Sequence, residues 1–416
     1  MIVLRPISLA CLCLPLALIA CSEATAPQSA ETAQALDPAL VHENLLALDS
    51  HIDIELDYIA EDMDPWTNEK GKISVQKMQD GGLDAAFMIV YTPQGEMNDA
   101  GVAKAREIAQ TRYKAISRLT EKYADQLTLA RTADEAHQIH KSGKKAIFLG
   151  MENAYPLGNS VDDVALWEKR GVRYLGITHM GHNQFADSSN PSYSRGETKT
   201  LYGGLSALGK DLVVALNDAG IMVDVSHTSK DTMMQAVALS AVPVIASHSG
   251  VKALVDNPRN LDDEQLKALA AKGGVIQIVA YGGYLKNLTP EQQAFKAAVR
   301  KEMDLEDDMA FLAMDEATEA LFDEKMEASK SLAPGASVAD LVDHIDYVAK
   351  LVGVEHVGIA SDFDGGGKIE GWWDVSETPN VTKALLKRGY SQADIEKIWG
   401  GNLLRVLAAV QAHAHQ

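Results

Sequence analysis

The sequence predicts an α/β fold, a (β/α)8 TIM-like barrel, and two observations support this prediction. The first is a set of short apolar segments, nearly continuous in Val, Ile, Leu and Ala, as expected of strands buried on both faces of a parallel sheet. The second is the helical spacing of apolar residues between these segments, for example in residues 100–127 and 206–220. Strands that alternate with helices in this number are typical of a (β/α)8 barrel. The apolar segments are residues 45–53, 84–91, 145–152, 173–179, 221–227, 242–249, 274–281 and 356–364.

An open, doubly wound sheet or two ordinary domains would also fit a chain of this length. The dinucleotide-binding form of such a sheet has no support, because no Gly-x-Gly-x-x-Gly turn follows the first strand. Residues 285–350 are rich in Asp, Glu, Met and Ala and predict a helical insertion between strands seven and eight. Residues 391–414 predict a C-terminal helix pair, which begins at a capping box of Ser391 and Asp394.

The first residues have the features of an export signal rather than of a folded domain. Arg5 precedes an apolar core that is shorter than the roughly 20 residues of a membrane-spanning helix. The core ends in "LIAC", residues 18–21, which resembles a bacterial lipobox and predicts lipidation of Cys21. The alternative is an ordinary signal peptide that contains a cysteine.

The predicted organisation is a lipoprotein signal peptide at 1–20, a flexible tether at 21–36 and a (β/α)8 domain at 37–416. This implies an exported bacterial lipoprotein that reaches the membrane through a lipid anchor on Cys21. Ser22 after the cysteine favours the outer membrane, with the protein facing the periplasm.

Composition excludes several kinds of site and partner. The three cysteines, Cys11, Cys13 and Cys21, all lie in the N-terminal segment, so the domain has no disulfide framework, thiolate metal site or cysteine nucleophile. The net charge of −20 argues against a nucleic-acid partner, which would require a basic surface.

Polar side chains that can bind metals follow most of the predicted strands. Parallel strands of a barrel place their carboxyl ends on one face, and this face holds the active site in barrel enzymes. A single residue of this kind is often only a cap or a turn, but the set as a whole predicts a shared site. Imidazoles and carboxylates without thiols suit Zn²⁺ and related divalent ions, and their number fits two metals better than one. The residues are His51, Asp53, Glu152, His179, His227, His248 and Asp362.

Several longer stretches resemble the membrane (renal-type) dipeptidase family of binuclear zinc peptidases. The resemblance runs in family order from about residue 45 to 410. It implies a barrel hydrolase that cleaves dipeptides through a metal-bridging hydroxide. The matching stretches include "DSHID", "GMENA", "GVRYLGITHMGHNQFADS", "VDVSHTS", "PVIASHSGVKAL", "PRNLDDE", "HVGIASDFDG" and "GNLLRVL".

The resemblance implies a role for each metal ligand. His51 and Asp53 would hold the first zinc, His227 and His248 the second, and Glu152 would bridge the two. Mn²⁺ or Co²⁺ would also suit these ligands.

The resemblance also implies three substrate contacts. His179 would face the substrate and stabilise the oxyanion, with His182 as a less favoured rival for this role. Arg259 would bind the carboxylate of the dipeptide, and Asp362 would meet its amino group and shuttle a proton. Dipeptides with free amino and carboxyl ends are therefore the expected substrates. The family also tends to form homodimers.

Two other functions fit the sequence less well than a dipeptidase. Another binuclear-metal barrel hydrolase, such as a deaminase or lactonase, usually begins with His-x-His and bridges its metals with a lysine carbamate, whereas this chain has His-x-Asp and a glutamate. A non-catalytic metal-binding surface lipoprotein would have lost ligands, and the sequence retains them all.

Overall fold

The computed structural model describes residues 1, 36–54, 60, 64, 71–306, 310 and 314–414. The chain divides into two units, Met1–Ala35 and Leu36–Gln416, and the account below concerns the second. Residues 2–35, which include most of the predicted signal peptide and tether and the predicted lipidation site Cys21, lie outside the described residues.

Each predicted strand segment contains one strand of a parallel sheet, and these eight strands follow one another in chain order. The sheet closes between its first and last strands, because the Asp53 amide donates to the Phe363 carbonyl (2.9 Å) and the Asp362 amide donates to the His51 carbonyl (3.0 Å). The predicted (β/α)8 barrel is therefore confirmed, and the alternative of an open doubly wound sheet is wrong. The strands are β1 (Leu48–Ile52), β2 (Ala85–Tyr91), β4 (Lys145–Glu152), β5 (Val172–Gly176), β6 (Met222–Asp224), β7 (Ile245–Ser249), β8 (Val275–Val279) and β9 (Val357–Ala360).

One further strand was not foreseen. The three-residue strand β3 (Leu127–Leu129) pairs with the start of β4, outside the cyclic order of the barrel. The preceding helix α3 ends at Lys122, so the helical pattern at 100–127 extended too far. A strand this short has too few residues to show an apolar alternation of its own.

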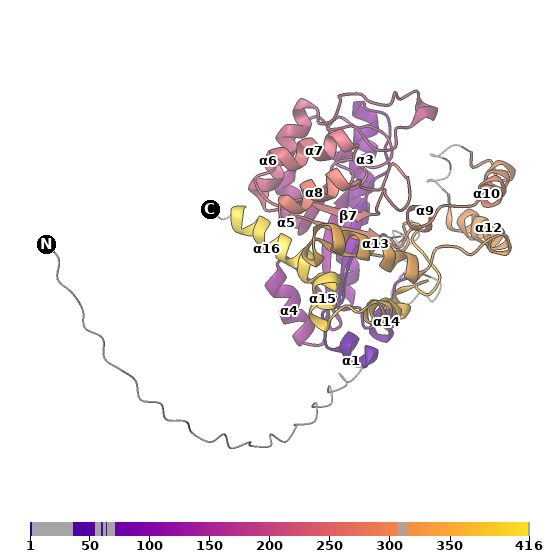
Figure 1. The fold of residues 1–416 in the computed structure, drawn as a ribbon. Helices are drawn as coiled ribbons and strands as arrows, with labels where there is room; N and C mark the ends of the chain where they lie inside the picture. Colours follow the sequence, from indigo (N-terminus) through magenta and orange to yellow (C-terminus); the bar gives the residue numbers. More distant parts are fainter. Residues whose placement is uncertain are drawn as a thin grey trace, which may run out of the picture. The chain divides into compact units, whose positions relative to one another are not determined.

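Helices surround the barrel on its outside (Figure 1). Those that follow β2 to β8 begin mostly at Ser, Thr, Asn or Asp caps; the Ser206 side chain, for example, accepts from the Gly209 amide at the start of α6. These helices are α3 (Asp99–Lys122), α4 (Ala133–Lys141), α5 (Val164–Arg170), α6 (Ala207–Ala219), α7 (Lys230–Leu239), α8 (Asp263–Ala271) and α13 (Val338–Val352). Further helices are α1 (Pro38–Glu43), which precedes β1, and α2 (Val75–Asp80), α9 (Gly282–Leu285) and α14 (Pro379–Arg388).

The amino-terminal end of the barrel is closed by the last helix, α16 (Asn402–Ala414). Its buried Leu403, Leu404 and Leu407 belong to one apolar cluster with inward side chains such as Leu48 and Phe148. The predicted C-terminal helix pair is confirmed: α15 (Gln392–Glu396) begins with the Ser391–Asp394 capping box, and a π-helical turn, Lys397–Gly401, joins it to α16. Apolar packing therefore fills one end of the barrel and leaves the other for polar side chains.

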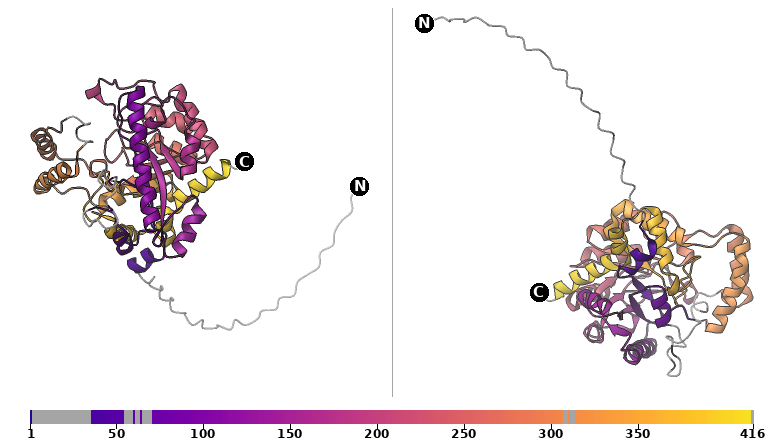
Figure 2. Two further views of the ribbon diagram at one scale, coloured as in Figure 1. Left: turned by 180° about the vertical axis from the view of Figure 1, so that it is seen from behind. Right: turned by 90° about the horizontal axis from the view of Figure 1, so that it is seen from below.

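The region predicted as an insertion consists of two parts. Helices α10 (Pro290–Glu302) and α12 (Glu316–Glu327) pack on each other outside the ring of barrel helices (Figures 1 and 2) and have a small apolar cluster of their own, with Val299 and Phe322. The last part, α13, buries Leu341 and Ile345 in the main core and is the barrel helix before β9. A continuous helical pattern from 285 to 350 concealed this boundary.

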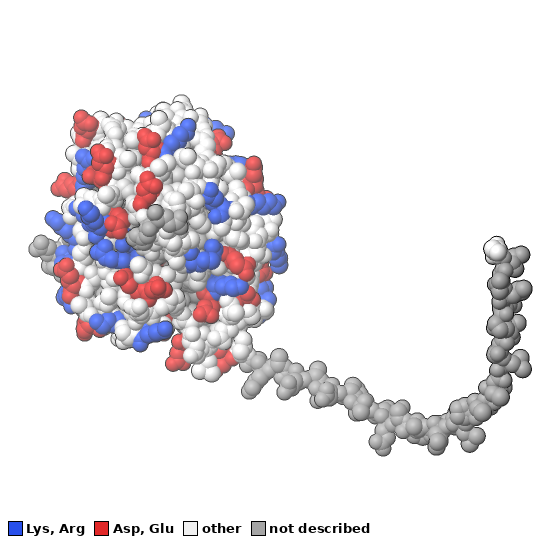
Figure 3. Space-filling model, turned by 90° about the vertical axis from the view of Figure 1, so that its left-hand side faces the viewer, with Lys and Arg blue, Asp and Glu red and all other residues white. Residues whose placement is uncertain are grey.

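The surface carries both signs of charge. On the face shown in Figure 3, lysine and arginine side chains are interspersed with aspartate and glutamate. Within the described part of the chain, no helix combines the length and the apolar character needed to cross a membrane.

Candidate active site

The seven candidate side chains at the strand ends lie together at the carboxyl end of the barrel. His51 is in β1, Glu152 ends β4 and His248 is in β7, while the others follow their strands by a few residues. All seven are buried, and none is more than 8% exposed. Their ligand atoms form three overlapping groups that could each hold a metal ion: His51, Glu152 and His248; Glu152, His179 and His227; and His51, Asp53 and Asp362.

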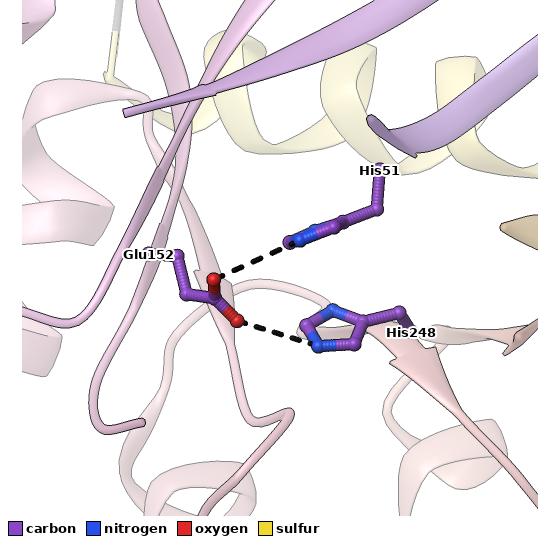
Figure 4. Close-up of side chains that lie close together, drawn as sticks. All are labelled: His51, Glu152 and His248. Atoms are coloured by element: carbon purple, nitrogen blue, oxygen red, sulfur yellow. Dashed lines mark ion pairs between the residues drawn. The ribbon is translucent and has the colours of Figure 1, made fainter. Parts of the chain in front are cut away.

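Glu152 occupies the centre of this cluster. Its Oε2 lies 3.8 Å from His51 Nε2, whereas its Oε1 lies 3.1 Å from His227 Nε2 and 3.3 Å from His248 Nε2. Figure 4 shows the carboxylate between His51 and His248, with one oxygen directed at each ring. A carboxylate in this position can bridge two cations, as the sequence predicts.

Neighbouring hydroxyl groups set the orientation of two of the imidazoles. Tyr174 Oη donates to the Ser50 carbonyl (3.1 Å), so it accepts from His51 Nδ1 at 2.8 Å. Ser247 Oγ donates to Asp224 Oδ2 (2.7 Å) and in the same way accepts from Nδ1 of the following histidine at 2.9 Å. In its neutral, metal-binding form each ring therefore directs the lone pair of Nε2 into the cluster, which is how metal-binding histidines are held by their outer neighbours.

The cluster fits divalent metal ions because its polar atoms do not satisfy one another. His51 Nε2, Asp53 Oδ1 and Glu152 Oε1 are buried without a hydrogen-bond partner. His227 Nε2 and His248 Nε2 lie only 2.9 Å apart. A cation satisfies lone pairs that converge in this way, whereas such buried groups are costly without one.

The electrostatics of the cluster lead to the same conclusion. Burial raises the pKa of Glu152 to about 8 and that of Asp362 to about 7. Burial acts to lower the pKa of His51, but Glu152, Asp53 and Asp362 outweigh it and raise this pKa to about 10. The carboxylates around His51 thus favour a positive charge at this position, and a bound metal ion would provide one. Burial also lowers the pKa of His179 to about 3, so this ring is neutral near pH 7.

Two of the candidate residues adopt a left-handed backbone conformation that is uncommon outside glycine. The φ angle is 64° at His227 and 59° at Asp362, and Asn153, which follows Glu152, has a φ of 75°. Such conformations cost free energy and occur frequently at functional sites. Here they redirect the chain where it leaves β6, β9 and β4.

Arg259 reaches the cluster from the loop between β7 and α8. Its guanidinium donates to the His248 carbonyl (2.9 Å) and to Ser249 Oγ (3.3 Å), and it lies 5.3 Å from the centre of the Tyr284 ring. Its Nε is buried without a hydrogen-bond partner. The nearby carboxylates Asp262 and Asp256 pair instead with Lys230 and Lys252.

His182, the rival of His179, has a structural role in its loop. Its Nδ1 accepts from the Ser188 amide (3.0 Å) and its Nε2 lies 2.9 Å from the Thr198 carbonyl, so both ring nitrogens are used within the loop. The Nε2 atom of His179 instead lies 4.0 Å from Glu152 Oε1.

Sequence analysis missed the residues that surround the cluster. Tyr174, Tyr91 and Ser247 lie inside strands or at their ends. Among apolar neighbours, a single hydroxyl-bearing residue does not stand out in the sequence as part of a site. Arg112 lies on α3 and is buried, with its Nη1 donating to the Ile54 carbonyl at 2.7 Å. The only signal for Arg112 is a charged residue on the buried face of a helix, which a sequence alone does not relate to a strand end.

Comparison with known proteins gives the family. The family model of membrane dipeptidases, peptidase family M19, matches residues 38–416. Dipeptidase tcpJ of Claviceps purpurea is 31% identical over 352 residues, which cover 83% of this chain and 71% of the relative.

Solved structures agree with this result. The crystal structure of the probable dipeptidase PvdM from Pseudomonas aeruginosa is 36% identical, has a TM-score of 0.81, and the match covers 90% of this chain and 98% of that one. A metallo peptidase from Rhodobacter sphaeroides, solved with a phosphinate mimic of the dipeptide L-Ala-D-Ala, shares the fold with a TM-score of 0.69 at 20% identity, over 88% of this chain and 99% of that one. The chain therefore belongs to the membrane dipeptidase family, peptidase family M19, and is a hydrolase that acts on dipeptides.

Proposed function

We propose that this protein is a zinc-dependent dipeptidase that requires both the free amino end and the free carboxyl end of its substrate. The observation that supports the metal pair is the position of Glu152, with one oxygen directed at His51 and the other at His227 and His248. When bound, two divalent metals would activate water and polarise the scissile carbonyl. His51 and Asp53 would hold the first ion, His227 and His248 the second, and Glu152 both.

Charged groups on both sides of the cluster explain the requirement for free ends. A dipeptide has one peptide bond, so its termini are the charged features by which a site can recognise it. Arg259 would pair with the carboxylate, because a planar guanidinium binds carboxylates through two hydrogen bonds. Asp362 would bind the ammonium group and accept or return a proton at its carboxylate.

His179 would stabilise the negative charge that develops on the carbonyl oxygen. It is neutral, buried and adjacent to Glu152, and a neutral imidazole can donate one hydrogen bond from Nε2. Removal of a donor of this kind from other enzymes costs about 2.7–4 kcal/mol in the rate-limiting barrier.

The test compares a free dipeptide with its amidated and N-acetylated forms, together with metal analysis of the purified protein. A site built to pair a buried charge can reject an analogue that lacks this charge by a factor of about 10⁴. We therefore expect both blocked forms to be cleaved far more slowly than the free dipeptide. Equal rates on free and blocked substrates would contradict the proposal, and so would full activity without bound metal.

We also propose that the mature protein is a lipoprotein of the outer membrane, facing the periplasm and anchored through Cys21. The support is the sequence "LIAC" followed by Ser22. Cys21→Ser should release the protein from the membrane fraction, and a wild-type protein found entirely in the soluble periplasmic fraction would contradict this. Size measurement of the purified protein would test the homodimer expected from the family.

A further inference from the structure

Three histidines of the site each have a hydroxyl group at Nδ1. For His51 this is Tyr174 Oη at 2.8 Å, and for His248 it is Ser247 Oγ at 2.9 Å. For His179 it is Tyr91 Oη at 3.5 Å, which is at the long end of hydrogen-bonding distances. The three contacts look alike, but the proton of the hydroxyl is directed differently in the third.

The difference lies in what else each hydroxyl contacts. Tyr174 and Ser247 donate their protons to the Ser50 carbonyl and to Asp224, so they accept from their histidines. Within the described ranges, Tyr91 Oη has no hydrogen-bond partner other than His179 Nδ1. A phenol, with an ordinary pKa of about 10, keeps its proton near pH 7. The Tyr91 proton is therefore available to His179, and donation to Nδ1 leaves the histidine proton on Nε2.

Packing on two sides keeps the Tyr91 ring at this position. Tyr91 is the last residue of β2 and pairs with Glu152 across the sheet. Its ring centroid lies 4.7 Å from that of His179, and the Arg112 guanidinium carbon lies 5.1 Å from the same tyrosine ring. Arg112 is itself fixed by its hydrogen bond to the Ile54 carbonyl. The hydroxyl is therefore held near one nitrogen of His179 by contacts of the ring alone.

We propose that Tyr91 is a positioning residue that fixes His179 in the tautomer with its proton on Nε2. This inference rests on the proposed function, in which His179 donates a hydrogen bond to the developing oxyanion. It also explains why His179 would not act as a metal ligand, although its ring belongs to a group with Glu152 and His227 that could hold an ion. The direction of the Tyr91 hydroxyl proton thus makes His179 a hydrogen-bond donor at Nε2, whereas His51 and His248 have a free Nε2 lone pair for a metal.

The kinetic test uses Tyr91→Phe, which removes the hydroxyl and keeps the ring between His179 and Arg112. We expect kcat to fall about threefold to tenfold, the loss of one neutral hydrogen bond, with KM and metal content unchanged. Tyr113→Phe is the control, because Tyr113 lies on α3 and, among the described residues, makes only ring contacts, with Trp167 and Arg170. It should leave kcat and KM as they are.

A double-mutant cycle distinguishes positioning from a general structural effect. In a His179→Gln background, Tyr91→Phe should cause no further loss, because the hydroxyl acts only through His179. Full additivity of the two losses would overturn the proposal, as would a Tyr91→Phe enzyme with unchanged kcat, or one whose loss is entirely in KM or in metal content.

A spectroscopic measurement on the metal-loaded wild-type protein provides a test without turnover. In protein labelled with ¹⁵N-histidine, the ring signals that disappear in His179→Gln identify His179. We expect its Nε2 to carry the proton and its Nδ1 to be a hydrogen-bond acceptor. Protonation at Nδ1 would overturn the inference even if the protein cleaves free dipeptides, whereas failure to cleave them would refute the proposed function and leave the tautomer measurable.

Discussion

Replacement of Glu152 by glutamine tests the central feature of the site. The amide keeps the shape of the side chain and one oxygen but loses the negative charge and replaces the other oxygen with a hydrogen-bond donor. In the structure one oxygen lies 3.1 Å from His227 and the other 3.8 Å from His51. One proposed metal therefore loses its oxygen ligand and the other keeps only a neutral amide oxygen in place of a carboxylate, so we expect both to bind more weakly.

The magnitude follows from the position of Glu152 inside the ligand set. Loss of an outer partner of a metal ligand typically weakens binding about 10–100-fold, so loss of a shared ligand should cost about 100-fold or more at each site. At a free metal concentration of about 1,000 times the wild-type Kd, each ion stabilises the fold by about 4.1 kcal/mol. A 100-fold weaker site retains about 1.4 kcal/mol, so each site loses about 2.7 kcal/mol of metal-linked stability.

The assay is metal content after gel filtration in metal-free buffer, together with unfolding at fixed metal concentrations. His248→Ala is the contrasting variant and should weaken the second ion while His51 and Asp53 keep the first. Glu396→Gln, at an exposed position of α15, is the matched control and should retain both ions. A Glu152→Gln protein that still holds two ions with wild-type affinity would refute the bridging assignment.

Three other predictions concern specificity, space and pH. Arg259→Ala should reduce the rate ratio between free and amidated dipeptides by at least tenfold, mainly by slowing cleavage of the free form; an unchanged ratio would exclude pairing with the carboxylate. Gly365→Ala should lower activity by tenfold or more, because a Cβ there would lie 2.2 Å from Asp53 Oδ2 and 2.5 Å from Asp362 Oδ1. Gly335→Ala is the control and should leave activity unchanged, because no atom lies within 4 Å of a Cβ at that position. His344 is 1% exposed, and burial lowers its pKa from 6.5 to about 4, so between these pH values the unfolded chain binds a proton that the folded protein does not. The free energy of unfolding should therefore fall by up to about 1.4 kcal/mol per unit as pH drops through this window, and His344→Asn should show a smaller decrease in urea titrations.

The sequence was sufficient to predict the barrel because its strands are buried on both faces. A strand such as β2 (Ala85–Tyr91) then consists of apolar and aromatic residues throughout, and this pattern differs clearly from that of the amphipathic helices between the strands. The site residues were predictable for a related reason. A histidine or carboxylate directly after such a segment, as at His51 and Glu152, interrupts the apolar pattern at the edge where the strands of a barrel converge.

Directions of side chains and of the backbone were not predictable in this way. The left-handed conformations of His227 and Asp362 leave no trace in residue type, because neither position is glycine. The boundary between the insertion and α13 was missed because both are helical and only packing separates them. Arg259 was found through the resemblance to a family, whereas its contact with Tyr284 depends on a distance that only the fold provides.

Tyr174 links the core of the barrel to the chemistry of the site. Its ring belongs to the apolar cluster that α16 closes, while its hydroxyl lies 2.8 Å from His51 Nδ1. The ring fits because residue 150 on β4 is glycine, and a Cβ there would lie 2.5 Å from Tyr174 Cζ. Packing at one end of the barrel thereby fixes the orientation of a proposed metal ligand, His51, at the other. Close-packed core residues thus hold the outer hydrogen-bond partners of the site, whereas loops supply the proposed substrate contacts Arg259 and Asp362.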